Sequence, residues 1–175
     1  MSQVRPIWSV AEINQLTCDA FVATLGYLFE HTPMIAERTW HDRPFSSCSE
    51  LHQALMRTMY ALSPAQQVDL ISAHPDLAGR AAIAGNLTAE SAREQRSVRL
   101  DQLSTNEYAR FQALNQAYRA KFGFPFIICV REHTLASILT NFERRIALSE
   151  ADEITTALGE IAKIAGLRLA DTVAD

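Results

Sequence analysis

The sequence has no long hydrophobic run, few cysteines and no dense basic stretch. Its longest strongly apolar stretch, residues 122–130, is far too short to span a bilayer. A net charge of −4 provides no basic surface for nucleic acid. The three cysteines are scattered and lack a CxxC pair, which favours a reducing compartment: Cys18, Cys48 and Cys129. We therefore expect no membrane span, no nucleic-acid partner and no disulfide framework.

Signatures of metal, nucleotide and serine-nucleophile sites are missing as well. The five histidines show no HExxH pattern and no Cys/His ligand spacing. No GxSxG, GxxxxGK[ST] or GxGxxG sequence occurs. We expect no metal ion, no nucleotide and no covalent serine mechanism. The ends carry neither a signal-peptide core nor a targeting tripeptide, which predicts a cytoplasmic protein.

The dominant hydrophobic period is helical, and no repeat or linker interrupts it. The 175 residues, 48% of them hydrophobic, are enough for one domain with a substantial core. The pattern predicts an all-α, single-domain helical bundle over residues 1–175, with about eight helices. Helices are expected at residues 11–30, 33–42, 49–61, 64–73, 88–100, 104–122, 134–148 and 150–172.

Capping residues in the sequence predict several helix ends. Thr32 with Pro33, and Ser63 with Pro64, have the types expected at an N-cap and first helical position. "STNE" from Ser104 predicts a capping box, and Gly123 a left-handed terminator.

One segment breaks the helical pattern. "FGFPFIICV", residues 122–130, is aromatic and β-branched, with one short extended segment expected near residues 124–130. No partner strand is visible, so its amide groups must bond side chains, water or a ligand. The segment is therefore either a ligand-binding wall or a buried connector.

A first candidate is His74 in "AHPD". Pro75 cannot continue a helix, so His74 is expected just past the C-terminus of the helix that begins at Pro64. The negative end of the helix dipole would favour imidazolium, a proton source near neutral pH. The alternative is a histidine that only caps this helix.

A second candidate is "SAREQ". Ser91, Glu94 and Gln95 lie at i, i+3 and i+4, so a helix places them on one face. A hydroxyl, a carboxylate and an amide together suit a small polar ligand with several N–H and C=O groups. The alternatives are a cap at Ser91 or a solvated face.

A third candidate, Arg131, ends the apolar run. Its stem can be buried while the guanidinium binds a carboxylate with two parallel hydrogen bonds. The alternative is a surface arginine paired with Glu132 or Glu143.

Taken in order, these pieces resemble the 2-oxo-4-hydroxy-4-carboxy-5-ureidoimidazoline (OHCU) decarboxylase family of urate catabolism. The resemblance rests on "TPMIAERTWHDRPF", "LISAHPDLAGRAA", "LTAESAREQ" and "KFGFPFIICVR", and covers about residues 14–169. It implies an all-α enzyme, commonly a homodimer, without metal or organic cofactor. Such an enzyme removes carbon dioxide from the product of 5-hydroxyisourate hydrolysis and forms (S)-allantoin.

The resemblance also implies roles for individual residues. His74 corresponds to the proton donor, and we hypothesise that Glu94 orients the substrate and tunes His74. Substrate contacts, largely through the main chain in the extended segment, are implied for Pro75, Ser91, Gln95, Phe126, Ile127, Ile128, Cys129, Val130 and, less firmly, Arg131.

Three other readings stay open at this point. One is a non-catalytic helical module that binds a ureide or purine, although His74 and Glu94 are both present. Another is cysteine-dependent chemistry, for which no cysteine pair is visible. The third is a ureide hydrolase, which would leave the substrate carboxylate in place and so release no carbon dioxide.

Overall fold

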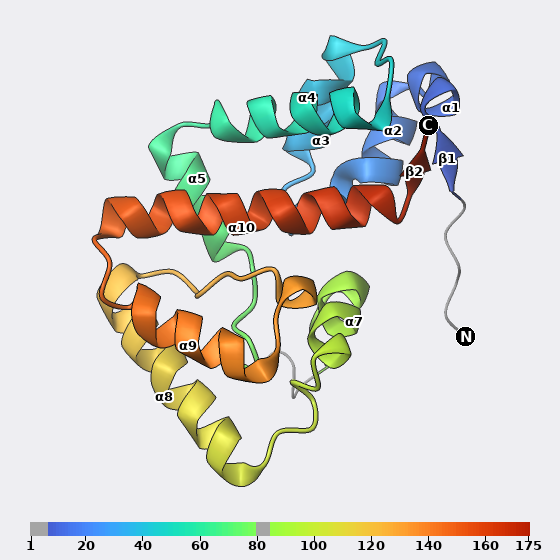
Figure 1. Ribbon diagram of the computed structural model, residues 1–175. Helices are drawn as coiled ribbons and strands as arrows, with labels where there is room; N and C mark the ends of the chain where they lie inside the picture. Colours follow the sequence, from blue (N-terminus) through green and yellow to red (C-terminus); the bar gives the residue numbers. More distant parts are fainter. Residues whose placement is uncertain (1–6, 80–84) are drawn as a thin grey trace. The chain divides into compact units, whose positions relative to one another are not determined.

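The computed structural model describes residues 7–79 and 85–175 and is built almost entirely of helices (Figure 1). Nine α-helices lie within these two ranges. They are α1 Val10–Gln15, α2 Cys18–Leu25, α3 Met34–Thr39, α4 Cys48–Tyr60, α5 Pro64–Ser72, α7 Ala89–Ser97, α8 Thr105–Phe122, α9 Leu135–Arg145 and α10 Glu150–Ala170. Three 3₁₀ turns follow the same order: η1 Gly26–Leu28, η2 Trp40–Asp42 and η3 Val130–Glu132. The all-α prediction is confirmed.

A minimal sheet joins the two ends of the described chain. β1 (Trp8–Ser9) pairs in parallel with β2 (Val173–Ala174), with Trp8 opposite Val173. Two residues are too few to show an alternating pattern, so no sequence pattern predicts this pair. It does not alter the all-α class.

The chain divides into two compact units. The first combines residues 1–70 with 162–175, and the second comprises residues 71–161. The boundaries therefore fall inside α5 and α10. Every candidate site residue lies in the second unit, and the expectation of one domain stays a prediction.

The first unit is built around α3, which packs against both α2 and α4. Phe21, Ile35 and Leu55 are completely buried in its core. Arg168 of α10 is also buried and pairs with Glu30 at 3.3 Å. Its guanidinium donates to the Tyr27 carbonyl as well, at 3.2 Å, so this charge is both paired and hydrogen-bonded.

The second unit has an aromatic core. The Phe126 and Phe142 rings stack at 3.9 Å with an interplanar angle of 12°. Tyr118 meets Phe142 edge-on at 5.5 Å, and Phe111 is completely buried beside them. These rings come from α8, α9 and the segment after α8, so one cluster ties the extended segment to two helices.

Most predicted helix ends are confirmed. Ser104 and Glu107 form the expected capping box at the start of α8, and Gly123 ends it with φ of 78°. The Ser63 hydroxyl accepts from the Gln66 amide at the start of α5. Each signal is local, so it survives packing.

Two predictions were wrong in detail. The helix expected over residues 11–30 is broken at Leu16 (ψ 141°), where the Thr17 side chain caps a new helix by accepting from the Ala20 amide. Thr32 is not a cap: its hydroxyl donates to the Glu30 carbonyl, and α3 begins after Pro33. In both places the threonine hydroxyl forms one of several possible local hydrogen bonds, and the residue type alone does not determine which one.

Candidate active site

His74 lies directly after α5, as predicted. Its amide donates to the Ile71 carbonyl at 3.2 Å and closes the last turn, while its side chain is 6% exposed. Pro75 follows and prevents the helix from continuing. The imidazole is therefore buried at the C-terminal end of α5.

The residues after Pro75 form a tight turn. The Gly79 amide donates to the Asp76 carbonyl at 3.3 Å, and Ala78 has φ of 49°, a left-handed conformation that side chains rarely adopt. A Cβ on Gly79 would lie 2.7 Å from the Cβ of Asp76. Glycine is therefore required there by space, and the sequence "HPDLAG" encodes one particular turn.

Four side chains from α7 and α8 hold this turn. The Ala78 amide donates to Gln95 Oε1 at 3.0 Å, and its carbonyl accepts from Gln112 Nε2 at 2.8 Å. Asn115 Nδ2 donates to the Leu77 carbonyl at 2.9 Å. Arg119 Nε donates to both Asp76 oxygens, at 2.9 and 3.1 Å. We call Gln95, Gln112, Asn115 and Arg119 the loop clamp.

The predicted polar face of α7 is present and buried. Ser91, Glu94 and Gln95 are 6%, 8% and 6% exposed. Thr88 caps the helix by accepting from the Ser91 amide, so the alternative of a cap at Ser91 is wrong. The alternative of a solvated face is also wrong for these three residues. Helix α7 packs against η3, which brings this helix close to the end of the apolar run (Figure 1).

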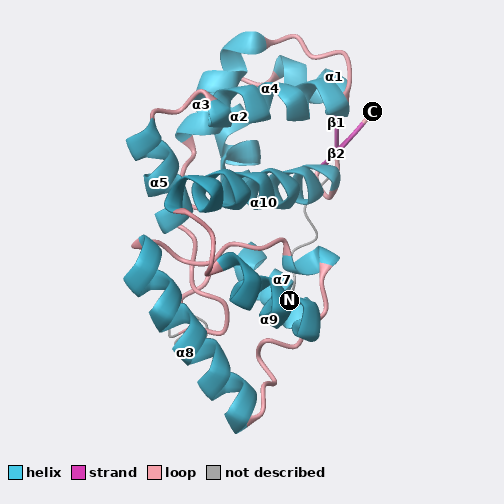
Figure 2. Cartoon of the chain, turned by 60° about the vertical axis from the view of Figure 1, so that its left-hand side comes forward, coloured by secondary structure: helices cyan, strands magenta, loops and turns pink. Residues whose placement is uncertain are grey.

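The apolar run forms no strand within the described part of the chain. Residues 125–129 are irregular and extended, and the chain between α8 and α9 is drawn mostly as loop (Figure 2). Side chains satisfy two of its main-chain groups. Arg145 donates to the Ile127 carbonyl at 2.7 Å, and the Cys129 amide donates to Glu160 Oε2 at 2.8 Å. The expectation that side chains would replace a ladder is confirmed for these two groups.

The side chains of this run are buried. Phe126, Ile127, Ile128, Cys129 and Val130 are each at most 5% exposed. The Arg145 guanidinium lies over the Phe126 ring, 4.4 Å from its centroid. The run is therefore buried, with two of its main-chain groups held by side chains, and both alternatives for its role stay open.

A buried ionic network fixes Arg145. Its guanidinium pairs with Glu153, and both side chains are at most 2% exposed. The Glu153 carboxylate also accepts from the Tyr118 hydroxyl. Burial, followed by the hydrogen bond to Glu153, raises the pKa of Tyr118 well above its usual value. The phenol therefore stays neutral and remains a donor.

Arg131 lies in η3 and is exposed. Glu143, one of its two suggested surface partners, forms an ion pair with Arg110 of α8. Arg131 belongs to η3, which packs against α7, and this position is compatible with a substrate contact. Its exposure distinguishes it from the other candidate residues.

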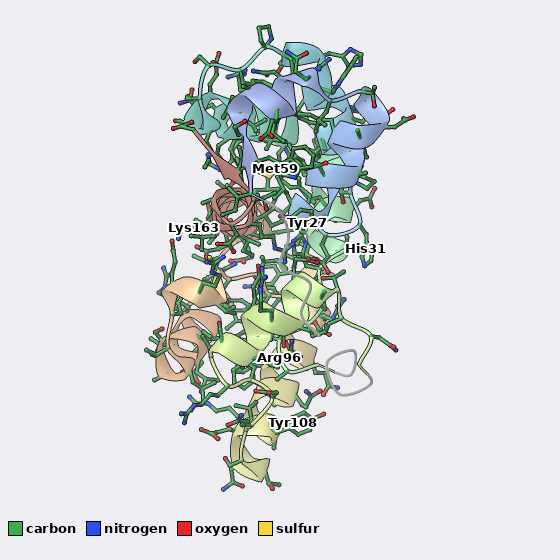
Figure 3. The ribbon with its side chains drawn as sticks, turned by 90° about the vertical axis from the view of Figure 1, so that its right-hand side faces the viewer. Tyr27, His31, Met59, Arg96, Tyr108 and Lys163 are labelled. Carbon is green, nitrogen blue, oxygen red and sulfur yellow. The ribbon has the colours of Figure 1, made fainter. Side chains whose placement is uncertain are left out.

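A cavity of about 520 Å³ lies on a neighbouring face of α7. Arg96 of α7 and Tyr108 of α8, labelled in Figure 3, belong to its lining. Ala78 and Gln95 also line it, whereas His74 and Glu94 are not among its described lining residues. The cavity therefore borders the loop clamp and is not itself the site of the candidate catalytic groups.

The described ranges hold neither a membrane-spanning helix nor a metal-ligand cluster. Over residues 7–79 and 85–175 no helix combines the length and apolar character needed to cross a bilayer. Within the same residues no cluster of three or more His, Cys, Asp or Glu side chains is suited to a metal ion.

Sequence reasoning missed the residues that support the site. Gln112, Asn115 and Arg119 lie at i, i+3 and i+7 on α8, so a polar stripe on one helix face was a usable signal. Arg145 and Glu160 gave no such signal, because their partners are main-chain atoms 18 and 31 residues away.

Comparison with known proteins covers nearly the whole chain. A family model described as OHCU decarboxylase matches residues 14–170. The 2-oxo-4-hydroxy-4-carboxy-5-ureidoimidazoline decarboxylase of Haloferax volcanii is 42% identical over 163 residues, which are 93% of this chain and 95% of that protein. The protein of the same name from Mus musculus is 39% identical over 93% of this chain and 91% of its own length.

Two solved structures resemble the chain. A crystal structure of (S)-allantoin synthase has a TM-score of 0.75 and 27% identity, covering 94% of this chain and 54% of that one. A crystal structure of OHCU decarboxylase in the presence of (S)-allantoin shares the fold, with a TM-score of 0.64 and 23% identity, over 78% of this chain and 88% of that one.

A helical scaffold with a buried histidine and a buried carboxylate, matched by decarboxylases over its length, defines an enzyme of the carboxy-lyase class. The chain belongs to the OHCU decarboxylase family. This supports the decarboxylase over a non-catalytic binding module.

Proposed function

We propose that this enzyme decarboxylates 2-oxo-4-hydroxy-4-carboxy-5-ureidoimidazoline to (S)-allantoin, with His74 as proton donor. The observation that carries the proposal is the family match over residues 14–170, which includes a buried His74 on a braced turn and a buried Glu94 on α7. The names of the relatives supply the substrate class.

The substrate's own chemistry makes a cofactor unnecessary. The C–C bond to the carboxylate breaks heterolytically, carbon dioxide leaves, and the electron pair is delocalised into the imine and carbonyl of the ring. Pyridoxal and thiamine cofactors supply such an electron sink to substrates that lack one. The protein then has to hold the ring, stabilise the developing charge and deliver one proton to one face.

The described residues divide these tasks. His74 donates the proton, which fixes the configuration at the protonated carbon. Glu94 orients the hydroxyl or ureido group of the substrate and tunes His74. Ser91 and the amide nitrogen of Gln95 donate to the ring's polar atoms. Gln95 Oε1 already accepts from Ala78, so its contribution to substrate is through the nitrogen.

The extended segment contributes main-chain contacts. The Ile127 carbonyl and the Cys129 amide already bond Arg145 and Glu160. We therefore assign the substrate contacts first to the main chain of Phe126 and Ile128 and to the Val130 amide, since the Val130 carbonyl accepts from the His133 amide. Pro75 packs beside His74, and Arg131 lies at the exposed end of the segment, where its guanidinium can reach an anionic group.

We also propose that the enzyme is a homodimer in the cytoplasm, as the family resemblance suggested. Sedimentation velocity at micromolar concentration tests the first statement, and a monomer would refute it. Fractionation of the source cells tests the second.

The activity is tested by circular dichroism. Substrate is generated in situ from urate with urate oxidase and hydroxyisourate hydrolase, and this enzyme is then added. Rapid growth of the (S)-allantoin signal is expected with the wild type. His74→Ala should show slow decay to racemic product, because the proton then comes from water on either face.

His41→Ala is the matched control, since His41 is an exposed histidine of the first unit. It should behave as the wild type. If His74→Ala is as fast and as stereospecific as His41→Ala, the role of His74 is wrong. If the wild type gives no acceleration and no carbon dioxide, the decarboxylase proposal itself fails.

A further inference from the structure

The turn after His74 is held by side chains rather than by helix or sheet hydrogen bonds. The Leu77 carbonyl and both main-chain groups of Ala78 bond side chains of the loop clamp, at 2.8–3.0 Å. An unmade hydrogen bond is costly at such buried groups, so each bond also specifies where the turn must lie. The left-handed Ala78 needs this support, because an alanine does not choose that conformation on its own.

His74 lies between two fixed points. On one side its amide closes the last turn of α5 on Ile71. On the other side Asp76, two residues later, is held by Arg119 Nε through both carboxylate oxygens. Pro75 between them has a restricted φ. The backbone that carries the imidazole therefore has little conformational freedom as long as the side chains of α8 bond the turn.

The clamp also connects the two candidate catalytic groups. Gln95 bonds Ala78 and is the direct neighbour of Glu94 on α7. Three further clamp residues, Gln112, Asn115 and Arg119, come from a single face of α8. Gln95 thus ties the His74 turn to the Glu94 helix, and the three residues of α8 tie the same turn to α8.

We propose that Gln112, Asn115 and Arg119 are positioning residues for the decarboxylation: they hold the turn that aims the His74 imidazole at one face of the substrate. The inference rests on the proposed function of His74. Misplacing a proton donor by a fraction of an ångström to an ångström lowers turnover by tenfold or more and leaves substrate binding nearly intact. It also lets water compete for protonation, which lowers the excess of the (S) product.

Gln112→Glu is the sharpest variant. It keeps the size of the side chain but replaces the amide that donates to the Ala78 carbonyl with a carboxylate that cannot. Gln116→Glu is the control, because it makes the same charge change on an exposed position of the same helix, four residues later. Rates are corrected for spontaneous decay of the substrate.

At pH 8 we expect kcat of Gln112→Glu to be at least tenfold below that of Gln116→Glu, with KM within twofold and a reduced (S) excess. No difference between the two variants in kcat and in (S) excess would overturn the proposal.

A second pair of variants guards against misfolding of the first. Arg119→Gln removes the partly exposed ion pair with Asp76. Arg110→Gln, on the same helix as Arg119, removes the exposed ion pair with Glu143 of α9. Only the first should lower kcat and the (S) excess. Equal behaviour of the two would refute a positioning role for Arg119.

A readout without turnover separates this inference from the proposed function. With ring-labelled histidine, the NMR signal of His74, assigned with His74→Ala, should shift and broaden in Gln112→Glu and Arg119→Gln but not in the controls. Unmoved signals would overturn the inference even in an active enzyme. If the His74 signal shifts in these variants but the wild type shows no activity, only the proposed reaction is refuted.

Discussion

At the scale of single residues, Arg145 and Glu153 are a buried pair of charges with several further hydrogen bonds. Both are at most 2% exposed, and the guanidinium Nε lies 3.1 Å from each carboxylate oxygen. Arg145 also bonds the Ile127 carbonyl, and Glu153 also accepts from Tyr118. Removing two charges from water is costly, so the pair is stable only because its remaining hydrogen-bonding groups are also satisfied. It holds the extended segment at the centre of the second unit.

Breaking this pair should therefore be expensive. Glu153→Gln leaves the Arg145 charge buried and uncompensated, and we expect the free energy of unfolding to fall by about 3 kcal/mol. Urea unfolding followed by circular dichroism measures it. Glu143→Gln breaks the exposed pair with Arg110 and should change stability by less than about 1 kcal/mol. Equal losses in the two variants would contradict this account of the buried pair.

At the scale of elements, glycine has opposite effects on stability at two positions in or next to helices. Gly123 ends α8 with φ of 78°, and its amide bonds the Arg119 carbonyl. Gly159 lies inside α10, where an added Cβ would meet no atom within 4 Å. The first position needs glycine for its backbone conformation. At the second position glycine only lowers the stability of the protein, because it gives the unfolded chain more conformational freedom.

Alanine substitutions should separate these two cases by sign. Gly123→Ala is expected to lower the free energy of unfolding by about 1 kcal/mol, because alanine is strained in the left-handed region. Gly159→Ala is expected to raise it by about 0.5–1 kcal/mol through helix propensity. Thermal and urea unfolding of both variants would test the pair, and the same sign in both would be incompatible with it.

At the scale of the whole molecule, three capping carboxylates in different helices respond to pH in the same direction. Hydrogen bonds from the preceding serines lower the pKa of Glu12, Glu50 and Glu107 at the starts of α1, α4 and α8. A carboxyl with a lower pKa in the folded state binds protons less readily than in the unfolded chain. Its contribution to stability is present above the unfolded pKa of about 4.3 and is lost as the pH falls through the folded value.

We accordingly expect the free energy of unfolding to decrease as the pH is lowered from 5 to 3. The triple variant Glu12→Gln, Glu50→Gln, Glu107→Gln should show a shallower decrease, because its amides still accept from the serines but no longer titrate. Urea unfolding at several pH values compares the two proteins. Parallel pH curves would show that other carboxyls cause the acid sensitivity.

Much of the candidate site was predictable because its signals are local. Pro75 places His74 after α5, and the spacing of Ser91, Glu94 and Gln95 places all three on one face, which the structure shows to be buried. The irregular run before Val130 also followed from the missing partner strand. The break at Leu16 and Thr17 was missed, since the hydrophobic pattern continues across it.

The sequence by itself determined most of the helices and several of their caps, because each depends on neighbours within about four positions along the chain. Only the tertiary structure decided which side chains complete the site. Arg145 and Glu160 bond the extended segment, and Asn115 bonds the Leu77 carbonyl 38 residues away. Such partners are selected by burial, since a buried main-chain group must be satisfied by whichever donor or acceptor the fold brings next to it.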